Sequence, residues 1–333
     1  MRIILTVIVL MMSINNVHAL EFSGKSYVVM DSNSGSVVES YNKDYTQSVA
    51  SISKIMTAII AIENGKLDDE YTIGDEVNEA WGSGVYIHIG DKITLKDLLY
   101  GVLLRSGNDA CMTLSKNVAG DIDTFVTMMN DKAKEIGMIN TRFSNPTGLD
   151  EEDDGNVSSA YDIALLMRYC TQNPIFNEII SCEKYTREDG NGVWHNKNKL
   201  LKDYKCCVGG KTGYTKKAKR TLVTRAIKDN VSLIIVTLNC GNDFEFHKRK
   251  YEECFNKFKN YIIFPKGIYN YNGHSFVVDK DLFYYKKADA NCFVDDHKVV
   301  LLADLNKLNE YKYRNTLYCI LYYSYLLLGD MFG

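Results

Sequence analysis

The stretch that most constrains the fold of this 333-residue chain is Ser51-Ile52-Ser53-Lys54-Ile55-Met56-Thr57-Ala58-Ile59-Ile60-Ala61-Ile62-Glu63-Asn64, followed by Gly65. Its apolar residues recur at intervals of three and four, which predicts one helix that ends at the glycine. The apolar surface is broad, so we expect this helix to lie at the centre of the core. Six large apolar residues form that surface: Ile52, Ile55, Met56, Ile59, Ile60 and Ile62.

The segments on both sides of this helix predict a sheet with helices around it. Two β-rich runs, 27–30 and 36–39, flank the polar turn 31–35 and predict a β-hairpin. Helices are expected at 94–104, 109–119, 121–136, 159–169 and 246–261, and strands at 221–224 and 231–238. A hairpin, then helices, then antiparallel strands predict an α+β fold in which helices flank an antiparallel sheet.

Composition and charge exclude several classes of protein. Apolar residues make up 46% of the chain and charged residues 24%, as in a globular protein with a full core. The net charge of −3 gives no basic excess, so no nucleic-acid partner is expected. Nine cysteines are an odd number, so at least one stays free or pairs with another molecule. None lies in a CxxC pair or at zinc-ligand spacing from a histidine, so we expect no metal.

Both ends of the chain differ from its middle. Residues 1–19 follow the pattern of a signal peptide: Arg2 is basic, 3–14 is apolar, and Val17-His18-Ala19 offers small residues for cleavage after Ala19. An uncleaved membrane anchor is the alternative. We expect a first domain at 20–263 and a small, tyrosine-rich β domain at 264–312. The tail at 313–333 is apolar all round, which predicts membrane attachment, with a buried terminal helix as the alternative.

The first chemical motif is Ser51-x-x-Lys54, at the start of the central helix. Residues three apart share one face of a helix, so the Lys54 amine is expected beside the Ser51 hydroxyl. A lysine whose pKa is lowered by burial can take the proton of a serine and make it a nucleophile. Helix-start N–H groups beside Ser51 can help to stabilise an oxyanion.

Two further motifs follow in the chain. Ser106-Gly107-Asn108 is expected in the turn after the 94–104 helix, where a hydroxyl can relay a proton and an amide can hold a carbonyl. Lys211-Thr212-Gly213 offers a cation and a hydroxyl to a carboxylate, and its glycine permits close approach of a substrate backbone. Taken singly, these motifs also fit ordinary turn chemistry.

The three motifs together are much more specific than any one of them. Ser106 lies 55 residues after Ser51, and Lys211 lies 105 residues after Ser106. The order S-x-x-K, S-x-N, K-T-G is that of β-lactamases and penicillin-binding proteins. Each motif also falls where its role requires: a helix start, an interhelical turn and a strand.

On these residues the chain resembles bacterial D-alanyl-D-alanine carboxypeptidases, the low-molecular-mass penicillin-binding proteins. The resemblance runs from about residue 25 to 262 and includes Phe143-Ser144-Asn145-Pro146-Thr147-Gly148-Leu149 and Asn198-Lys199-Leu200-Leu201. It implies a DD-peptidase/β-lactamase-like sheet flanked by helices, a small C-terminal β domain, and a location on the outer face of the bacterial membrane. It also implies removal of the terminal D-alanine from peptidoglycan stem peptides, without cofactor, and acylation by β-lactams.

The resemblance further implies a role for each matching residue. Ser51 would be the acylated nucleophile, Lys54 its base, Ser106 a proton relay and Asn108 the group that holds the substrate amide. Substrate binding would fall to a second set, in which the backbone N–H of Tyr214 joins that of Ser51 in the oxyanion hole: Lys211, Thr212, Gly213, Tyr214 and, beside the carboxylate, His247. For His247, a surface position at a helix start is the alternative.

Two other functions share the same motifs. A β-lactamase would need rapid deacylation, and Glu152 with Asn156 fits E-x-x-x-N, but this glutamate lies in the acidic stretch 150–154, which reads as a solvated loop. A non-catalytic penicillin-binding sensor or wall-binding module would keep the fold and lack a catalytic group, whereas Lys54, Ser106 and Lys211 are all present.

Overall fold

The computed structural model describes residues 22–150, 155–229, 231–264, 267–271, 274–278 and 282–287. The predicted signal peptide and the apolar tail at 313–333 lie outside these ranges. Within them, every helix is too short or too polar to cross a bilayer.

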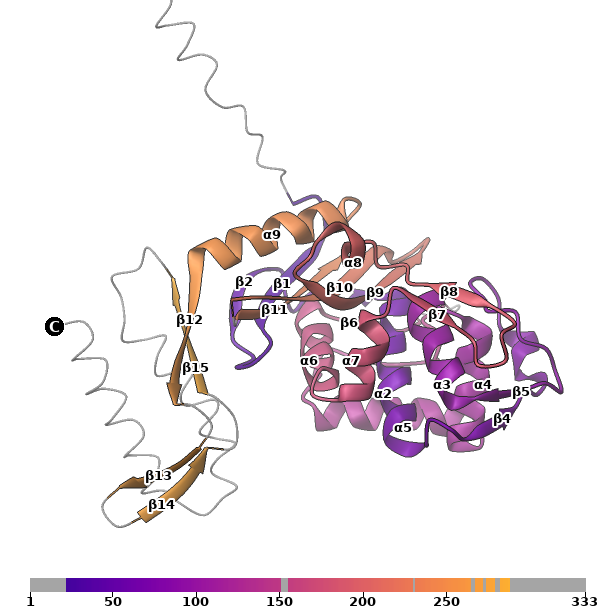
Figure 1. Cartoon of the computed structure of the whole chain (residues 1–333). Coiled ribbons are helices and arrows are strands. Elements are labelled where there is room, and N and C mark those ends of the chain that lie inside the picture. Colours follow the sequence, from indigo (N-terminus) through magenta and orange to yellow (C-terminus); the bar gives the residue numbers. More distant parts are fainter. Residues whose placement is uncertain are drawn as a thin grey trace, which may run out of the picture.

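The centre of the molecule is a five-stranded sheet in the order β2-β1-β11-β10-β9 (Figure 1). Every neighbouring pair is antiparallel. The strands are β1 (Ser26–Asp31), β2 (Val37–Tyr41), β9 (Cys207–Thr215), β10 (Lys219–Lys228) and β11 (Val231–Leu238). The predicted hairpin and the two late strands are thus confirmed, and β9 forms one edge.

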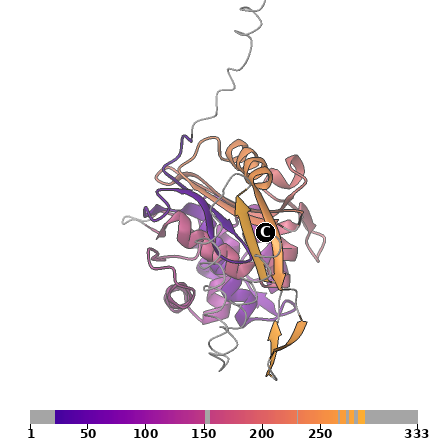
Figure 2. The same ribbon diagram turned by 90° about the vertical axis from the view of Figure 1, so that its left-hand side faces the viewer.

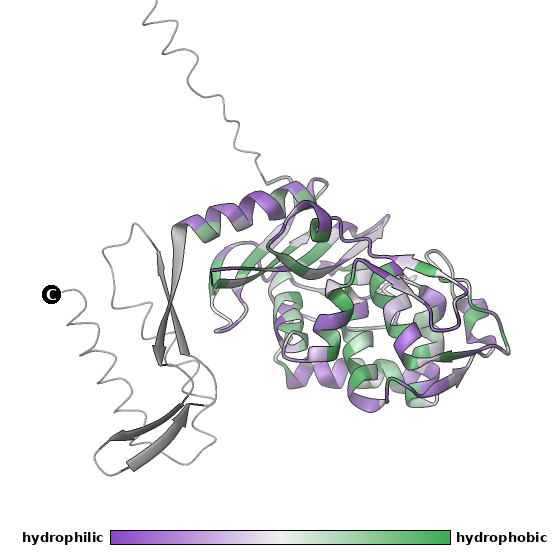
Figure 3. Cartoon of the chain, viewed as in Figure 1, coloured by the Kyte–Doolittle hydropathy of each residue, from purple (hydrophilic) through white to green (hydrophobic). Residues whose placement is uncertain are grey.

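Side chains alternate between the two faces of this sheet. In β11, Ile234 and Val236 pack against the core that contains α2, whereas Leu233 and Ile235 pack against the core beneath α9. Because both faces are covered, the strand is almost wholly apolar instead of alternating with polar residues. Figure 3 shows the same contrast: the sheet and α2 are mainly hydrophobic, and α9 is mainly hydrophilic.

Most helices cover one face of the sheet and α9 (Asp243–Lys257) covers the other (Figures 1 and 2). The central helix is α2 (Lys54–Asn64), preceded by a turn of 3₁₀ helix at Ala50–Ser53. Its residues from Lys54 to Ile62 are all buried, as the sequence predicted. The others on that side are α3 (Leu95–Tyr100), α4 (Asn108–Ala119), α5 (Ile122–Glu135), α6 (Ala160–Cys170) and α7 (Pro174–Ser181), while the short α8 (Leu200–Asp203) packs its Leu200 into the α9-side core.

Two predicted helices differ from the structure. The helix expected at 94–104 is divided: Thr94 ends strand β5 (Lys92–Thr94) and caps α3, and Gly101–Arg105 then forms a π-helical turn. Such wide turns are common at functional sites because they re-aim the residues that follow. The helix expected at 246–261 is wrong after Lys257, where strand β12 (Phe258–Phe264) begins.

Short two-stranded sheets complete the described chain. β12 pairs with β15 (Leu282–Lys287), and β13 (Gly267–Tyr271) with β14 (His274–Val278), in the part where short strands were predicted. Three smaller pairs lie among the helices: β3 (Gln47–Ser48) with β6 (Val157–Ser158), β4 (Glu70–Thr72) with β5, and β7 (Lys184–Thr186) with β8 (Val193–His195).

Candidate active site

Ser51 and Lys54 lie together where the 3₁₀ turn passes into α2. The Lys54 ammonium is fully buried and donates hydrogen bonds to Ser51 Oγ at 3.0 Å and to Asn108 Oδ1 at 2.7 Å. It also donates to the Thr147 carbonyl oxygen. A lysine fixed by three acceptors has one orientation, so its amine is held against the serine hydroxyl.

Burial changes the acid–base chemistry of this lysine. It lowers the pKa of Lys54 from 10.5 to about 8, and the positive charge of Lys197 acts in the same direction. With that pKa about one tenth of the molecules carry a neutral Lys54 amine at pH 7, compared with a negligible fraction for an exposed lysine. The site can therefore supply a base to Ser51 near neutral pH.

Ser106 and Asn108 reach the same place from the π-helical turn. Ser106 ends that turn in the left-handed region, at φ 64°, and the Gly107 N–H donates to the Gly101 carbonyl at 3.1 Å. The chain then starts α4 at Asn108, which is buried and bonded to Lys54. A serine with positive φ is uncommon and is strained, and such strain is concentrated at functional sites.

Lys211 brings the third motif into the cluster. It is buried on β9, and its ammonium donates to Ser106 Oγ at 3.0 Å and to the Thr212 carbonyl at 2.9 Å. Burial lowers the pKa of Lys211 well below its usual range, and the charges of Lys54 and Lys197 add to the effect. Ser106 thus accepts from Lys211 and lies two residues before Asn108, which accepts from Lys54.

Gly213 lets β9 approach the nucleophile. A Cβ at this position would lie 3.0 Å from the Ser51 backbone nitrogen and would collide with Thr221 Oγ1. The next residue, Tyr214, is 64% exposed on this edge strand. The Ser51 N–H and the outer edge of β9 therefore lie side by side, as an oxyanion hole and an added peptide strand would need.

Two loops hold the cluster in position. In the Asn145–Gly148 turn, the Asn145 side chain accepts from the Thr147 and Gly148 N–H groups, at 3.1 and 2.7 Å, which aims the Thr147 carbonyl at Lys54. Opposite it, Asp109 accepts from the N–H groups of Val85 and Tyr86, at 3.0 and 2.7 Å. Sequence analysis used the first loop only as part of the family resemblance and assigned no role to the second.

Residues 81–86 lie against Asn108. The Asn108 side chain donates to the Trp81 carbonyl, and its N–H donates to the Ser83 carbonyl at 2.7 Å. Lys197, from the loop before α8, donates to Ser83 Oγ at 3.2 Å. The bond to the Trp81 carbonyl orients the Asn108 side-chain amide. The bond to Ser83 brings Lys197, a cation that the three motifs did not predict, to the same place.

His247 is not part of this cluster. Its ring is fully buried between Thr224 Oγ1 at 2.7 Å and Thr237 Oγ1 at 3.0 Å, and burial lowers its pKa to about 3. Both threonines face α9, on the side of the sheet opposite α2. The expected contact with a substrate carboxylate and the alternative of a surface histidine both disagree with this position.

Other sequence expectations have structural outcomes as well. Asn156 is buried and accepts from the Ser144 and Asn145 N–H groups at 2.8 and 3.1 Å, which is a structural role, and Glu152 lies outside the described residues. Among the described residues, the following cysteines are free thiols: Cys111, Cys170, Cys182, Cys206, Cys207 and Cys240.

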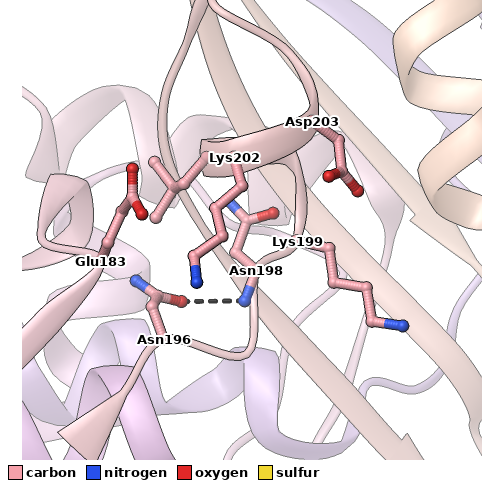
Figure 4. Close-up of a pocket in the computed structure, with 7 residues that line it drawn as sticks. Glu183, Asn196, Asn198, Lys199, Lys202 and Asp203 are labelled. Carbon is pink, nitrogen blue, oxygen red and sulfur yellow. Dashed lines mark hydrogen bonds between the residues drawn. The ribbon is translucent and has the colours of Figure 1, made fainter.

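A surface pocket lies near the Lys197 loop. It has a volume of about 280 Å³ and is lined by Glu183, Asn196, Asn198, Lys199, Leu201, Lys202 and Asp203. Figure 4 shows Asn196 bonded through its side-chain oxygen to the Asn198 N–H, at 2.9 Å. This bond fixes the backbone on both sides of Lys197.

The site so assembled has the arrangement of a serine acyl-transfer centre of the Ser-x-x-Lys type, with a buried amine at the Ser51 hydroxyl and a second lysine at Ser106. A family model described as D-alanyl-D-alanine carboxypeptidase, peptidase S11, matches residues 13–242. The chain therefore belongs to the D-alanyl-D-alanine carboxypeptidase family.

Individual relatives agree with this family. The D-alanyl-D-alanine carboxypeptidase DacF of Bacillus subtilis is 34% identical over 234 residues, which cover 68% of this chain and 60% of that protein. DacA of Escherichia coli is 35% identical over 241 residues, covering 68% and 58%. The chain thus spans about 60% of the length of these curated relatives.

The fold is shared with solved penicillin-binding proteins. Penicillin-binding protein 5 of Haemophilus influenzae aligns with a TM-score of 0.71 at 26% identity, covering 81% of this chain and 84% of that one. A D-alanyl-D-alanine carboxypeptidase from Mycobacterium tuberculosis aligns with a TM-score of 0.67 at 28% identity, covering 70% and 91%. The antiparallel sheet flanked by helices is therefore the DD-peptidase fold that the sequence predicted.

Proposed function

We propose that this protein is a serine-type D-Ala-D-Ala carboxypeptidase that removes the terminal D-alanine from peptidoglycan pentapeptide stems. The observation that carries the proposal is the 3.0 Å bond between the buried Lys54 amine and Ser51 Oγ. Membership of the carboxypeptidase family supports the same reaction.

The chemistry follows from the positions of these groups. Neutral Lys54 takes the proton of Ser51 as Oγ attacks the carbonyl carbon of the penultimate D-alanine. The backbone N–H groups of Ser51 and Tyr214 stabilise the oxyanion. The peptide C–N bond then breaks, and the proton that Lys54 took passes by way of Ser106 to the departing D-alanine amine, which leaves Lys54 neutral. Water hydrolyses the Ser51 ester, which returns a proton to Oγ and releases the shortened stem.

The remaining motif residues bind the substrate. Lys211 and Thr212 hold the terminal carboxylate, and Asn108 holds the amide of the preceding residue. The stem peptide adds to the free edge of β9, where Gly213 leaves room for its backbone. β-Lactams acylate Ser51 because their strained amide resembles the D-Ala-D-Ala end.

We also propose that the enzyme is exported and acts outside the cytoplasm. Support comes from the signal-like residues 1–19 and from the location of the proposed substrate in the cell wall. The apolar tail at 313–333 would attach the β-rich segment and the catalytic domain at 20–263 to the membrane.

Release of D-alanine tests the proposed function. The full chain is incubated with a diacylated tripeptide ending in D-Ala-D-Ala, and separately with fluorescent penicillin. Covalent labelling together with D-alanine release is expected. Labelling without release would favour a penicillin-binding sensor, fast penicillin hydrolysis without an adduct would favour a β-lactamase, and no labelling of folded protein would contradict the site.

A further inference from the structure

Two cations next to residues of the site have no role in the chemistry described above. Arg105 is the last residue of the π-helical turn and directly precedes Ser106. Lys197 is held close to it, since the Lys197 N–H donates to the Leu104 carbonyl at 3.3 Å. Among the residues that the structure describes, neither cation forms an ion pair with a carboxylate.

Electrostatic repulsion among the positive side chains of the site disfavours the charged forms of Lys197 and its neighbours. Partial burial and the positive charge of Arg105 lower the pKa of Lys197, and Lys197 in turn lowers the pKa of Lys54 and Lys211. Arg105 thus acts on Lys197, and Lys197 acts on both Lys54 and Lys211. Like charges repel, and the repulsion is relieved when an anion binds among them.

The Asp109 carboxylate, whose charge raises the pKa of Lys54, is already engaged by the backbone. The Asp109 carboxylate accepts from the backbone N–H groups of Val85, Tyr86 and Ala110. The Asp109 carboxylate therefore points toward the backbone of the 81–86 segment and its oxygens are taken up by these N–H groups. The proposed substrate supplies one anion, its terminal carboxylate, to Lys211 and Thr212, which leaves Lys197 and Arg105 without a counterion.

Hydrogen bonds hold the loop that carries Lys197 in one conformation. Asn196 donates to the Cys182 carbonyl at 3.0 Å and accepts from the Asn198 N–H (Figure 4). Asn198 in turn accepts from the Leu200 N–H at 3.2 Å. The Lys197 amine itself is bonded to Ser83 Oγ, whose residue carries the carbonyl that binds the Asn108 N–H. Lys197 is therefore fixed on the Asn108 side of the site before substrate arrives.

We infer that Lys197, Arg105 and the Ser83 hydroxyl form a second anion-binding subsite, which recognises a carboxylate on the side chain of the residue that precedes the D-Ala-D-Ala pair. This rests on the proposed function, in which Asn108 binds the amide of that part of the stem. A guanidinium, an ammonium and a hydroxyl together offer the charge-assisted hydrogen bonds that a carboxylate accepts. The enzyme is then selective for stem peptides with an acidic residue at this position.

Matched substrates test the subsite. N-acylated tripeptides X-D-Ala-D-Ala are prepared with X as glutamate or glutamine, and as the one-carbon-longer acid and its amide. The ratio of kcat/KM for acid over amide is expected to be about 10 in the wild type for at least one pair. It should fall to about 1 in Lys197→Met, fall part of the way in Arg105→Gln, and decrease with added salt.

A matched control variant distinguishes recognition by the subsite from a general effect of removing a positive charge. Lys199→Met removes an exposed lysine two residues away and should leave the ratio at its wild-type value. A wild-type ratio of 1 for both pairs, or an unchanged ratio in Lys197→Met, overturns the subsite. Penicillin labelling of each variant reports that the site is folded. If no tripeptide releases D-alanine from the wild type, the proposed function fails instead.

Discussion

The buried ammonium of Lys54 lies 3.0 Å from Ser51 Oγ, across a single turn at the junction of a 3₁₀ helix and α2. The same ammonium is bonded to Asn108 Oδ1 and to the Thr147 carbonyl. Three segments far apart in sequence therefore fix one amine against one hydroxyl. In the proposed mechanism, the protonation state of this amine governs whether Ser51 acts as a nucleophile.

The acylation of Ser51 should depend on pH through Lys54. Because burial lowers the pKa of Lys54 to about 8, the neutral base becomes more abundant as pH rises toward 8 and is saturated above it. The second-order rate constant for penicillin acylation should rise about tenfold per pH unit from 6 to 7 and level off beyond 8. Stopped-flow measurement with a fluorescent penicillin gives this profile, and a rate independent of pH between 6 and 8 would rule out Lys54 as the base.

Gly213→Ala should disable the site without unfolding it. The added methyl group would lie 3.0 Å from the Ser51 nitrogen and would collide with Thr221 Oγ1, so β9 and the nucleophile must move apart. We expect penicillin acylation to slow by about 100-fold or more. Gly241→Ala is the matched control because a Cβ there meets no atom within 4 Å. Equal acylation rates in the two variants would refute the close approach.

Asp109→Asn should loosen the 81–86 segment. The carboxylate accepts from Val85, Tyr86 and Ala110 N–H groups, and an amide in its place must direct an N–H at another N–H. The free energy of unfolding should fall by about 1–3 kcal/mol, measured by chemical denaturation. Asp75→Asn, which breaks an exposed ion pair with Lys116, should lower it much less. A loss for Asp109→Asn no greater than for this control would contradict the anchoring role.

His247 should make the protein less stable in acid. Its pKa is about 3 in the folded state and near 6.5 when unfolded, so between these values the unfolded chain binds more protons. The contribution is complete above pH 6.5 and is lost as pH falls, at up to about 1.4 kcal/mol per pH unit. Asp31, whose pKa burial raises to about 6, has the opposite effect at pH 4–6.

A comparison of variants isolates the histidine from Asp31. His247→Gln should give a flatter dependence of unfolding free energy on pH from 6.5 to 4 than the wild type. His195→Gln, at an exposed position on β8, should keep the wild-type slope. If His247→Gln and the wild type have the same slope, the buried neutral histidine is not responsible for acid sensitivity.

Sequence reasoning predicted the parts of this molecule that depend on local pattern. The apolar spacing of α2 and the turn residues of the first hairpin identify elements whose geometry is set within a few residues. The Ser51–Lys54 contact is also local, because it spans one helical turn. The fold class and the proximity of the three motifs followed from these patterns and from the family resemblance.

What the sequence did not reveal depends on contacts between distant segments. The Thr147 carbonyl contributes through its backbone, so no side-chain motif indicates it. No sequence pattern distinguishes Lys197 from the other lysines, and only the path of the loop before α8 places it beside Ser83. The family resemblance placed His247 beside the substrate carboxylate, but the face of the sheet that α9 covers is decided by tertiary packing.

Mass spectrometry after penicillin treatment tests the central claim, that Ser51 is the acylated nucleophile. The wild type should gain the mass of one penicilloyl group, and the proteolytic peptide that carries the adduct should contain Ser51. Ser51→Ala should remain unmodified and should release no D-alanine from a peptide ending in D-Ala-D-Ala. An adduct of equal yield in Ser51→Ala, or a wild-type adduct on another residue, would contradict the assignment.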